Sequence, residues 1–146
     1  MTSLPAAGDI ADMTHSTEVP QESALLAGVV LPGVPAWEVE ESLDELARLA
    51  DTATLAIVDR VLQNRRRIDP TYYIGKGKAE ELRDLASSRN ADMIIFDNDL
   101  SPAQMRNLET LTNKRILDRS AIILDIFALH ASTRTAQVQV ELAQLS

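Results

Sequence analysis

The sequence predicts an α/β fold in which a small, mainly parallel, four-stranded sheet is flanked by helices. Two observations lead to this class: four short apolar runs are spread along the chain, and segments with helical periodicity separate them. Parallel neighbouring strands need long crossover connections, which helices usually supply. With 146 residues and 45% hydrophobic content, the chain can form one ordinary domain with its own core.

The predicted organisation has three parts. Residues 1–23 mix Thr, Ser, Pro, Gly and small apolar residues without a strand or helix period, so we expect a disordered leader. Residues 24–131 are expected to form the α/β domain. Residues 132–146 are expected to start a further helical segment, because apolar residues recur there at helical spacing and neither glycine nor proline stops the pattern.

Apolar runs predict the first two strands and the helix between them. Ser23–Leu31 is nearly all apolar and ends at Pro32, which favours a strand buried on both faces. Trp37–Ala53 has acids near its start, where the helix dipole favours them, and an apolar helical face. Thr54–Gln63 is a second strand-like run, and Pro70 bars its simple continuation. The apolar face of the helix consists of Val39, Leu43, Leu46, Ala47 and Ala50.

The same alternation continues in the second half. Lys76–Ser88 carries an apolar helical stripe, and Asp92–Asp97 is a third strand-like run. Ser101 is expected to begin the next helix, because serine can cap the third helical amide, Pro102 fits the first position and Gln104 can reach back.

Two elements complete the predicted domain. Lys114–Asp118 would be the fourth strand, and Ser120–His130 would be a mostly buried helix. The apolar residues of that helix are Ile122, Ile123, Ile126, Phe127 and Leu129.

The net charge of −8 is concentrated in the first third of the chain. Residues 1–50 carry nine acids against one base, whereas residues 51–146 carry thirteen of each. Within Asp59–Lys78, six bases stand against two acids, a local charge of +4. A basic segment on a neutral domain is compatible with an anionic partner, and also with an ordinary solvated strand end and loop.

The stretch Thr71–Lys78 joins the second strand to its following helix and contains two tyrosines, two glycines and two lysines. Gly75 and Gly77 allow positive φ or a close approach of another molecule, and Lys76 and Lys78 lie at the helix start, where amide groups point outward. Such a junction can receive phosphate. It is not a P-loop, because the four-residue spacer and the Ser/Thr after the lysine are missing. The alternative is a strand-to-helix turn that needs glycine.

Several kinds of site are excluded by composition. The chain has no cysteine, and His15 and His130 are too far apart to suggest a metal cluster. No apolar run approaches the roughly 20 residues that span a bilayer, and no secretion signal begins the chain. We therefore expect a cytoplasmic protein without a metal site or catalytic residues. Asp97 and Asp99 form the best carboxylate pair, but they have no base, metal partner or phosphate loop beside them.

Six segments, taken in order, carry a family resemblance. They are Asp69–Lys78, Ile95–Gln104, Arg106–Glu109, Asp118–Ser120, Ile123–Ala128 and Val140–Leu145. Together they resemble the amino-terminal domain of the HflX family of ribosome-associated GTPases. The match covers about residues 24–146 and rests on several separate motifs.

The resemblance implies an α/β amino-terminal domain, then a helical segment, then a G domain that binds GTP with magnesium. This chain contains no G-x-x-x-x-G-K-[ST] sequence, and Asn113–Ile116 departs from the guanine-recognition pattern Asn-Lys-x-Asp at its fourth position. We therefore place no GTP site or cofactor on this part. The resemblance also implies binding to the large ribosomal subunit and its RNA, and rescue of stalled ribosomes by subunit splitting.

Three functions remain open for this domain. The first is a binding module whose basic segment contacts ribosomal RNA through phosphates, with a tyrosine stacked on an exposed base; core packing is the alternative interpretation of both tyrosines. The second is an intramolecular regulator that packs on the helical and G regions without RNA contact. The third is a domain that binds ATP at the glycine–lysine junction. The candidate binding residues are Arg65, Arg66, Arg67, Tyr72, Tyr73, Gly75, Lys76, Gly77 and Lys78.

Overall fold

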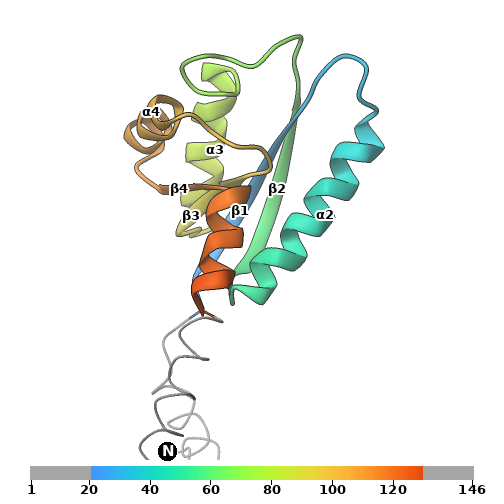
Figure 1. Cartoon of the computed structure of the whole chain (residues 1–146). Coiled ribbons are helices and arrows are strands. Elements are labelled where there is room, and N and C mark those ends of the chain that lie inside the picture. Colours follow the sequence, from blue (N-terminus) through green and yellow to red (C-terminus); the bar gives the residue numbers. More distant parts are fainter. Residues whose placement is uncertain (1–20, 130–146) are drawn as a thin grey trace, which may run out of the picture.

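The computed structural model describes residues 21–129 and contains a parallel four-stranded sheet with helices on both faces (Figure 1). The strands are β1 (Ser23–Val30), β2 (Ala56–Asn64), β3 (Met93–Phe96) and β4 (Arg115–Asp118). The helices are α2 (Ala36–Thr52), α3 (Lys76–Ser88) and α4 (Pro102–Thr112), and a further helix covers residues 119–129. The predicted fold class is confirmed. The expected leader up to residue 20 and the expected helical segment 132–146 lie outside the described residues.

The strand order is β2-β1-β3-β4, and all three pairings are parallel. The chain moves outward from β1 to β2 and then crosses back over β1 to reach β3. Right-handed crossovers in opposite directions put their helices on opposite faces of the sheet. The carboxyl ends of β1 and β3 are therefore the point at which the winding reverses, which is where open α/β sheets bind ligands.

Alternate residues of the buried strands feed two separate hydrophobic cores. Leu25 and Ile94 point to the face covered by α3 and α4, while Leu26 and Ile95 point to the face covered by α2 and the 119–129 helix. This alternation explains why β1 is buried from Ala24 to Val29, as the continuous apolar run predicts. In contrast, β2 is an edge strand, and it is half-buried along most of its length.

The predicted helix start at Ser101 is confirmed in detail. Ser101 Oγ accepts a hydrogen bond from the Gln104 amide at 3.1 Å, and Gln104 Oε1 accepts one from the Ser101 amide at 2.9 Å. Gln104 Nε2 also donates to the Asp69 carbonyl at 2.9 Å, so the cap of α4 holds the loop that precedes α3.

The prediction of a mostly buried helix after β4 is wrong for residues 119–129. Ile122 is fully buried and Ile126 is partly buried, but Leu124 is 66% exposed and Phe127 is 67% exposed. The reason is geometric: one stripe of this helix packs on the sheet, and no described element covers its other side. None of the helices within residues 21–129 is long and apolar enough to span a membrane.

Candidate functional site

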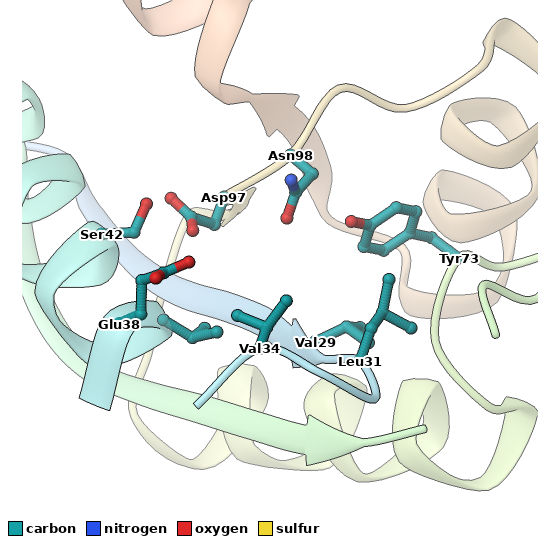
Figure 2. A pocket seen from close by; sticks show the side chains of 9 residues that line it. Val29, Leu31, Val34, Glu38, Ser42, Tyr73, Asp97 and Asn98 are labelled. Carbon is teal, nitrogen blue, oxygen red and sulfur yellow. The ribbon is translucent and has the colours of Figure 1, made fainter. Parts of the chain in front are cut away.

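A cavity of about 310 Å³ opens at the carboxyl ends of β1 and β3 (Figure 2). We call it the switch-point cavity. Its floor is aliphatic and its rim carries a carboxylate, a carboxamide and two hydroxyl groups in addition to Asp97. The lining residues are Val29, Leu31, Val34, Glu38, Val39, Ser42, Tyr73, Asp97 and Asn98.

Four elements place these side chains. Val29 lies next to the last residue of β1, the loop that follows contains Leu31, and the first turn of α2 supplies Glu38. Asp97 follows β3 directly, since its amide donates to the Ala27 carbonyl at 3.0 Å. The parallel pairing of β1 with β3 thus brings together groups that are about 60 residues apart in sequence.

Arg119 lies behind one wall of the cavity and fixes the position of the Asp97 side chain. Its Nη2 donates to Asp97 Oδ1 at 2.8 Å and to Ser42 Oγ at 2.9 Å, and its Nη1 donates to Glu45 Oε1 at 2.6 Å. Burial lowers the pKa of Arg119, but its hydrogen bonds to Asp97 and Glu45 raise that pKa by more, so the net shift is upward. Asp97, whose side chain is 6% exposed, is therefore a paired structural anion.

Tyr73 forms the opposite wall and has an unusual backbone. Its φ is 68°, in the left-handed region that non-glycine residues rarely adopt. Asp69 stabilises this turn: its Oδ1 accepts the amides of Thr71 and Tyr72 at 2.7 and 2.8 Å, and its amide and carbonyl bond the backbone of Tyr73. The Tyr73 ring packs edge to face on Phe96 with centroids 5.9 Å apart.

The Tyr73 hydroxyl points into the cavity in Figure 2. The residue is only 6% exposed, yet no group within residues 21–129 forms a hydrogen bond with that hydroxyl. Desolvation by burial, with smaller contributions from the charges of Asp97 and Asp99, raises the pKa of Tyr73 to about 12. The phenol is therefore neutral at physiological pH and is able to donate.

The basic candidates lie where the end of β2 meets the start of α3. We call Arg65, Arg66, Arg67, Lys76 and Lys78 the basic lip. Arg65 and Gly75 make the junction: a Cβ on Gly75 would lie 2.6 Å from Arg65 Nη1, and the Gly75 amide donates to Gln63 Oε1 at 2.9 Å. Leu31 connects the two regions, since it lines both the switch-point cavity and a hollow beside Arg65 and Arg66.

The two glycines of the stretch Thr71–Lys78 do not supply positive φ. Gly75 has φ −66°, and within the described chain Gly33 is the glycine with positive φ, at 84°. Gly75 instead allows the close approach of the Arg65 guanidinium. Gly77 lies in the exposed first turn of α3, and a Cβ there would meet nothing within 4 Å. The left-handed position of the turn is taken by Tyr73.

The tyrosines differ in exposure. Tyr73 is buried in the core, so its ring has no free face for a base in this structure, and this fits the core-packing interpretation. Tyr72 is half-buried at the edge of the same core.

The carboxylate pair Asp97 and Asp99 does not act as a unit, because the two side chains have different partners. Asp97 binds Arg119, whereas Asp99 Oδ1 accepts a hydrogen bond from the Ser120 hydroxyl at 2.6 Å.

Sequence reasoning missed Glu38, Ser42 and Arg119 as neighbours of Asp97. The sequence places Glu38 among the acids at a helix start, and nothing in the sequence pairs it with a residue after the third strand. The topology offers one signal. In a parallel sheet, the helix that follows a central strand starts at the edge where the neighbouring strand ends, so residues of that helix start and of that strand end can lie together.

The residues described do not fit GTP with magnesium. No group of three or more His, Asp or Glu side chains within residues 21–129 is arranged to hold a metal ion. The Gly75 amide at the start of α3 is already bonded to Gln63, and the carboxylates of Glu38 and Asp97 in the switch-point cavity would repel phosphate groups.

The family model described as GTP-binding GTPase N-terminal matches residues 40–128. The chain belongs to this family. Proteins called GTPase HflX are similar to it: that of Lacrimispora saccharolytica is 46% identical over 132 residues, which cover 88% of this chain and 31% of the relative. For Escherichia coli the identity is 42% over 105 residues, with 72% of this chain and 25% of the relative covered. The resemblance to the amino-terminal domain of the HflX family is confirmed.

The chain spans less than a third of the length of these two relatives. Among solved structures, a GTP-binding protein from Sulfolobus solfataricus in complex with GDP superposes with a TM-score of 0.59 at 24% identity. That likeness covers 86% of this chain and 36% of the solved one, and it supports the α/β fold of this family member.

Proposed function

We propose that this family member is the amino-terminal, ribosome-binding and regulatory domain of an HflX-type GTP-binding protein. The complete protein would associate with the large ribosomal subunit in the cytoplasm and help to split or rescue stalled ribosomes. GTP and Mg²⁺ would bind the G domain of that protein, while this domain would supply contacts to ribosomal RNA. The observation that carries the RNA contact is the basic lip.

Three cations of the basic lip, Arg66, Arg67 and Lys76, are exposed, whereas Arg65 Nε already donates to the Arg67 carbonyl at 3.0 Å. Within residues 21–129, the side chains of Arg66, Arg67 and Lys76 have no ion-pair or hydrogen-bond partner, and Lys78 contacts only Glu81, at 3.4 Å. Exposed cations of this kind bind the phosphate backbone of nucleic acid and release its counterions.

The start of α3 favours anions for a second reason. The helix has no side-chain cap and no acid in its first turn. Its first amide groups after Gly75 therefore have no protein partner within the described chain, and the helix dipole is not offset there. The capping box of α4 shows the contrasting case, in which serine and glutamine satisfy the corresponding groups.

The proposal is tested by replacing Lys76 and Lys78 with Gln in the full-length protein and measuring large-subunit binding over a salt series. We expect weaker binding and a salt slope reduced by one to two units of log K per log salt, because roughly one counterion is released per phosphate neutralised. The matched control replaces Arg106 and Lys114 with Gln, which removes two charges from α4 and from the turn between α4 and β4, and it should bind like wild type. If the lysine variant binds like wild type at every salt concentration, the junction is a structural turn.

A second candidate function is regulation of the G domain by direct packing. The observation in its favour is the exposed apolar side of the 119–129 helix, where Leu124 and Phe127 are each about two-thirds exposed. Replacing both residues with Gln would change the GTP hydrolysis rate of the full-length protein without changing its RNA affinity. An unchanged hydrolysis rate would remove this surface from regulation.

The isolated chain is expected to show no GTP hydrolysis above the buffer background. Hydrolysis needs a phosphate cradle, a magnesium site and a positioned water, and the described residues offer no candidate for the first two. The measurement is phosphate release from purified chain with magnesium present. Turnover that persists through further purification would contradict this expectation.

A further inference from the structure

Three polar side chains line the switch-point cavity without a protein partner in the described chain, one of them buried and two at the exposed rim. The Tyr73 hydroxyl, the Asn98 carboxamide and the Glu38 carboxylate have no hydrogen-bond or ion-pair partner within residues 21–129. Figure 2 shows all three directed toward the same space. Glu38 and Asn98 are exposed at the rim of the cavity, whereas Tyr73 is only 6% exposed. Buried polar groups are normally paired, so the Tyr73 hydroxyl is the observation that points to a ligand.

The charge of the cavity decides which ligands it can accept. Among residues 21–129, no lysine or arginine lines it, whereas Glu38 and Asp97 both do. The nearby cation, Arg119, cannot serve an incoming anion, because each of its three nitrogen atoms already donates to Asp97, Ser42 or Glu45. Phosphates and carboxylates are therefore disfavoured. A metal ion is disfavoured too, because the described residues hold no cluster of three potential metal ligands.

The walls add a second requirement. Val29, Leu31, Val34 and Val39 give the cavity an aliphatic floor, and its volume of about 310 Å³ lies at the lower end of small-molecule sites. A ligand must therefore combine an apolar stem with a polar, positively charged end. Ammonium and guanidinium groups on an alkyl chain have this form, since their stems pack on apolar surface while their heads seek oxygen atoms.

We propose that the switch-point cavity binds an alkylammonium or alkylguanidinium group, with the stem on the aliphatic floor. The charged head is held by the Glu38 carboxylate, the side-chain carboxamide oxygen of Asn98 and the Tyr73 hydroxyl. Glu38 balances the charge of the head. The phenol accepts a hydrogen bond through its oxygen, and the raised pKa of Tyr73 keeps it neutral. The two sources with this chemistry are a lysine or arginine side chain of a protein segment and a free aliphatic diamine.

This site is distinct from the basic lip in both charge and ligand. The basic lip offers cations to an anion, whereas the cavity offers oxygen atoms to a cation. Neither depends on the other, so ribosome binding and cation binding can fail separately in experiment.

The test is an NMR titration of the isotope-labelled 146-residue chain with small probes of known charge. The cationic probes are capped lysine (N-acetyl-lysine N-methylamide), capped arginine and 1,5-diaminopentane. The neutral probe is capped norleucine, which matches the lysine stem without its charge, and the anionic probe is glutarate. We expect amide shifts confined to residues around the cavity and dissociation constants on the order of 1 mM for at least one cationic probe.

Two substitutions locate the head of the ligand. Glu38→Gln should lower the affinity for the cationic probe about tenfold, because the charged head loses an ionic hydrogen bond. Tyr73→Phe should lower that affinity about threefold, because the head loses a hydrogen bond to a neutral group. The matched controls are Glu41→Gln, an exposed acid on the same helix outside the cavity, and Tyr72→Phe, the neighbouring ring outside the cavity. Both controls should bind like wild type, and the spectrum of each variant reports whether it is folded.

The outcomes separate as follows. Binding of capped lysine or capped arginine assigns the site to a protein side chain, and binding of the diamine alone assigns it to a free amine. Equal affinity for capped norleucine would overturn the charge requirement, and tighter binding of glutarate would overturn the assignment of sign. The expected dissociation constant is about 1 mM, so a probe concentration of about 20 mM should nearly saturate the site. If no cationic probe shifts the amide signals at that concentration, the proposed site does not exist.

Discussion

The basic lip and the switch-point cavity share one edge of the sheet, but their charged groups differ in what they contact. In the basic lip, Arg66, Arg67 and Lys76 project from a strand end and a helix start without a described partner. At the cavity wall, Arg119 uses every nitrogen of its guanidinium on the protein itself. One arginine-rich region is therefore available to another molecule, and the other arginine is part of the scaffold.

This difference shows why counting charges does not locate a binding site. Arg119 and Asp97 nearly cancel in a sequence total, yet together they join β3, the 119–129 helix and α2. The +4 segment Asp59–Lys78 also contains Arg60, whose guanidinium pairs with Asp44 at 2.8 Å and is not available to a partner. Pairing decides which cations can bind something else.

The largest expected effect comes from breaking the Arg119 contacts. Arg119→Met keeps much of the packing but leaves the buried Asp97 carboxylate unpaired, so we expect the free energy of unfolding to fall by about 3 kcal/mol. The check is urea denaturation of the chain. Arg66→Ala serves as the comparison, since loss of an exposed, unpaired cation should change stability by no more than about 0.5 kcal/mol. Equal effects of both variants would erase the distinction between the two regions.

Tyr73 offers a second test through pH. Its pKa in the folded protein is about 12, above the ordinary value of 10.0, so the folded state retains a proton that the unfolded state releases first. Stability from this group is complete below pH 10 and is lost as pH rises toward 12. We expect the melting temperature of wild type to fall more steeply over this window than that of Tyr73→Phe. Tyr72→Phe, as a control, should follow wild type.

At neutral pH the same phenylalanine variant should be slightly more stable than wild type. The Tyr73 hydroxyl is buried without a hydrogen-bond partner in the described chain, so removing it removes a desolvation cost of up to about 1 kcal/mol. The measurement is the urea midpoint at pH 7. A clear loss of stability would mean that the hydroxyl has a partner and would weaken the case for a ligand.

The smallest expected effects come from the two glycines beside the basic lip. Gly77→Ala should stabilise the chain by about 0.5 kcal/mol, because its backbone does not need positive φ and a Cβ there has open space. Gly75→Ala should be neutral or mildly destabilising, because the new methyl group must displace the Arg65 guanidinium. Thermal melts of the two variants check the order. A larger loss at position 77 would restore the view that this glycine has a conformational role.

Much of the fold follows from local patterns. The run Ser23–Leu31 has no polar alternation because both faces of β1 are covered, and that pattern is visible in one dimension. Ser101, Pro102 and Gln104 satisfy the first amides of α4 with groups at most three residues away, so their roles could be predicted from spacing alone. The bounds of α3, Lys76–Ser88, match the prediction because its apolar stripe is also a pattern of neighbours along the chain.

The sequence by itself determined the alternation of strands and helices, the family and the position of the basic segment, because these depend on neighbours along the chain. The tertiary structure alone decided which charges are satisfied. Glu38 lies in α2, Tyr73 in the connection from β2 to α3 and Asn98 in the loop after β3, and they meet because β1 pairs with both β2 and β3. Contacts of this kind depend on strand order and register, which no local spacing encodes.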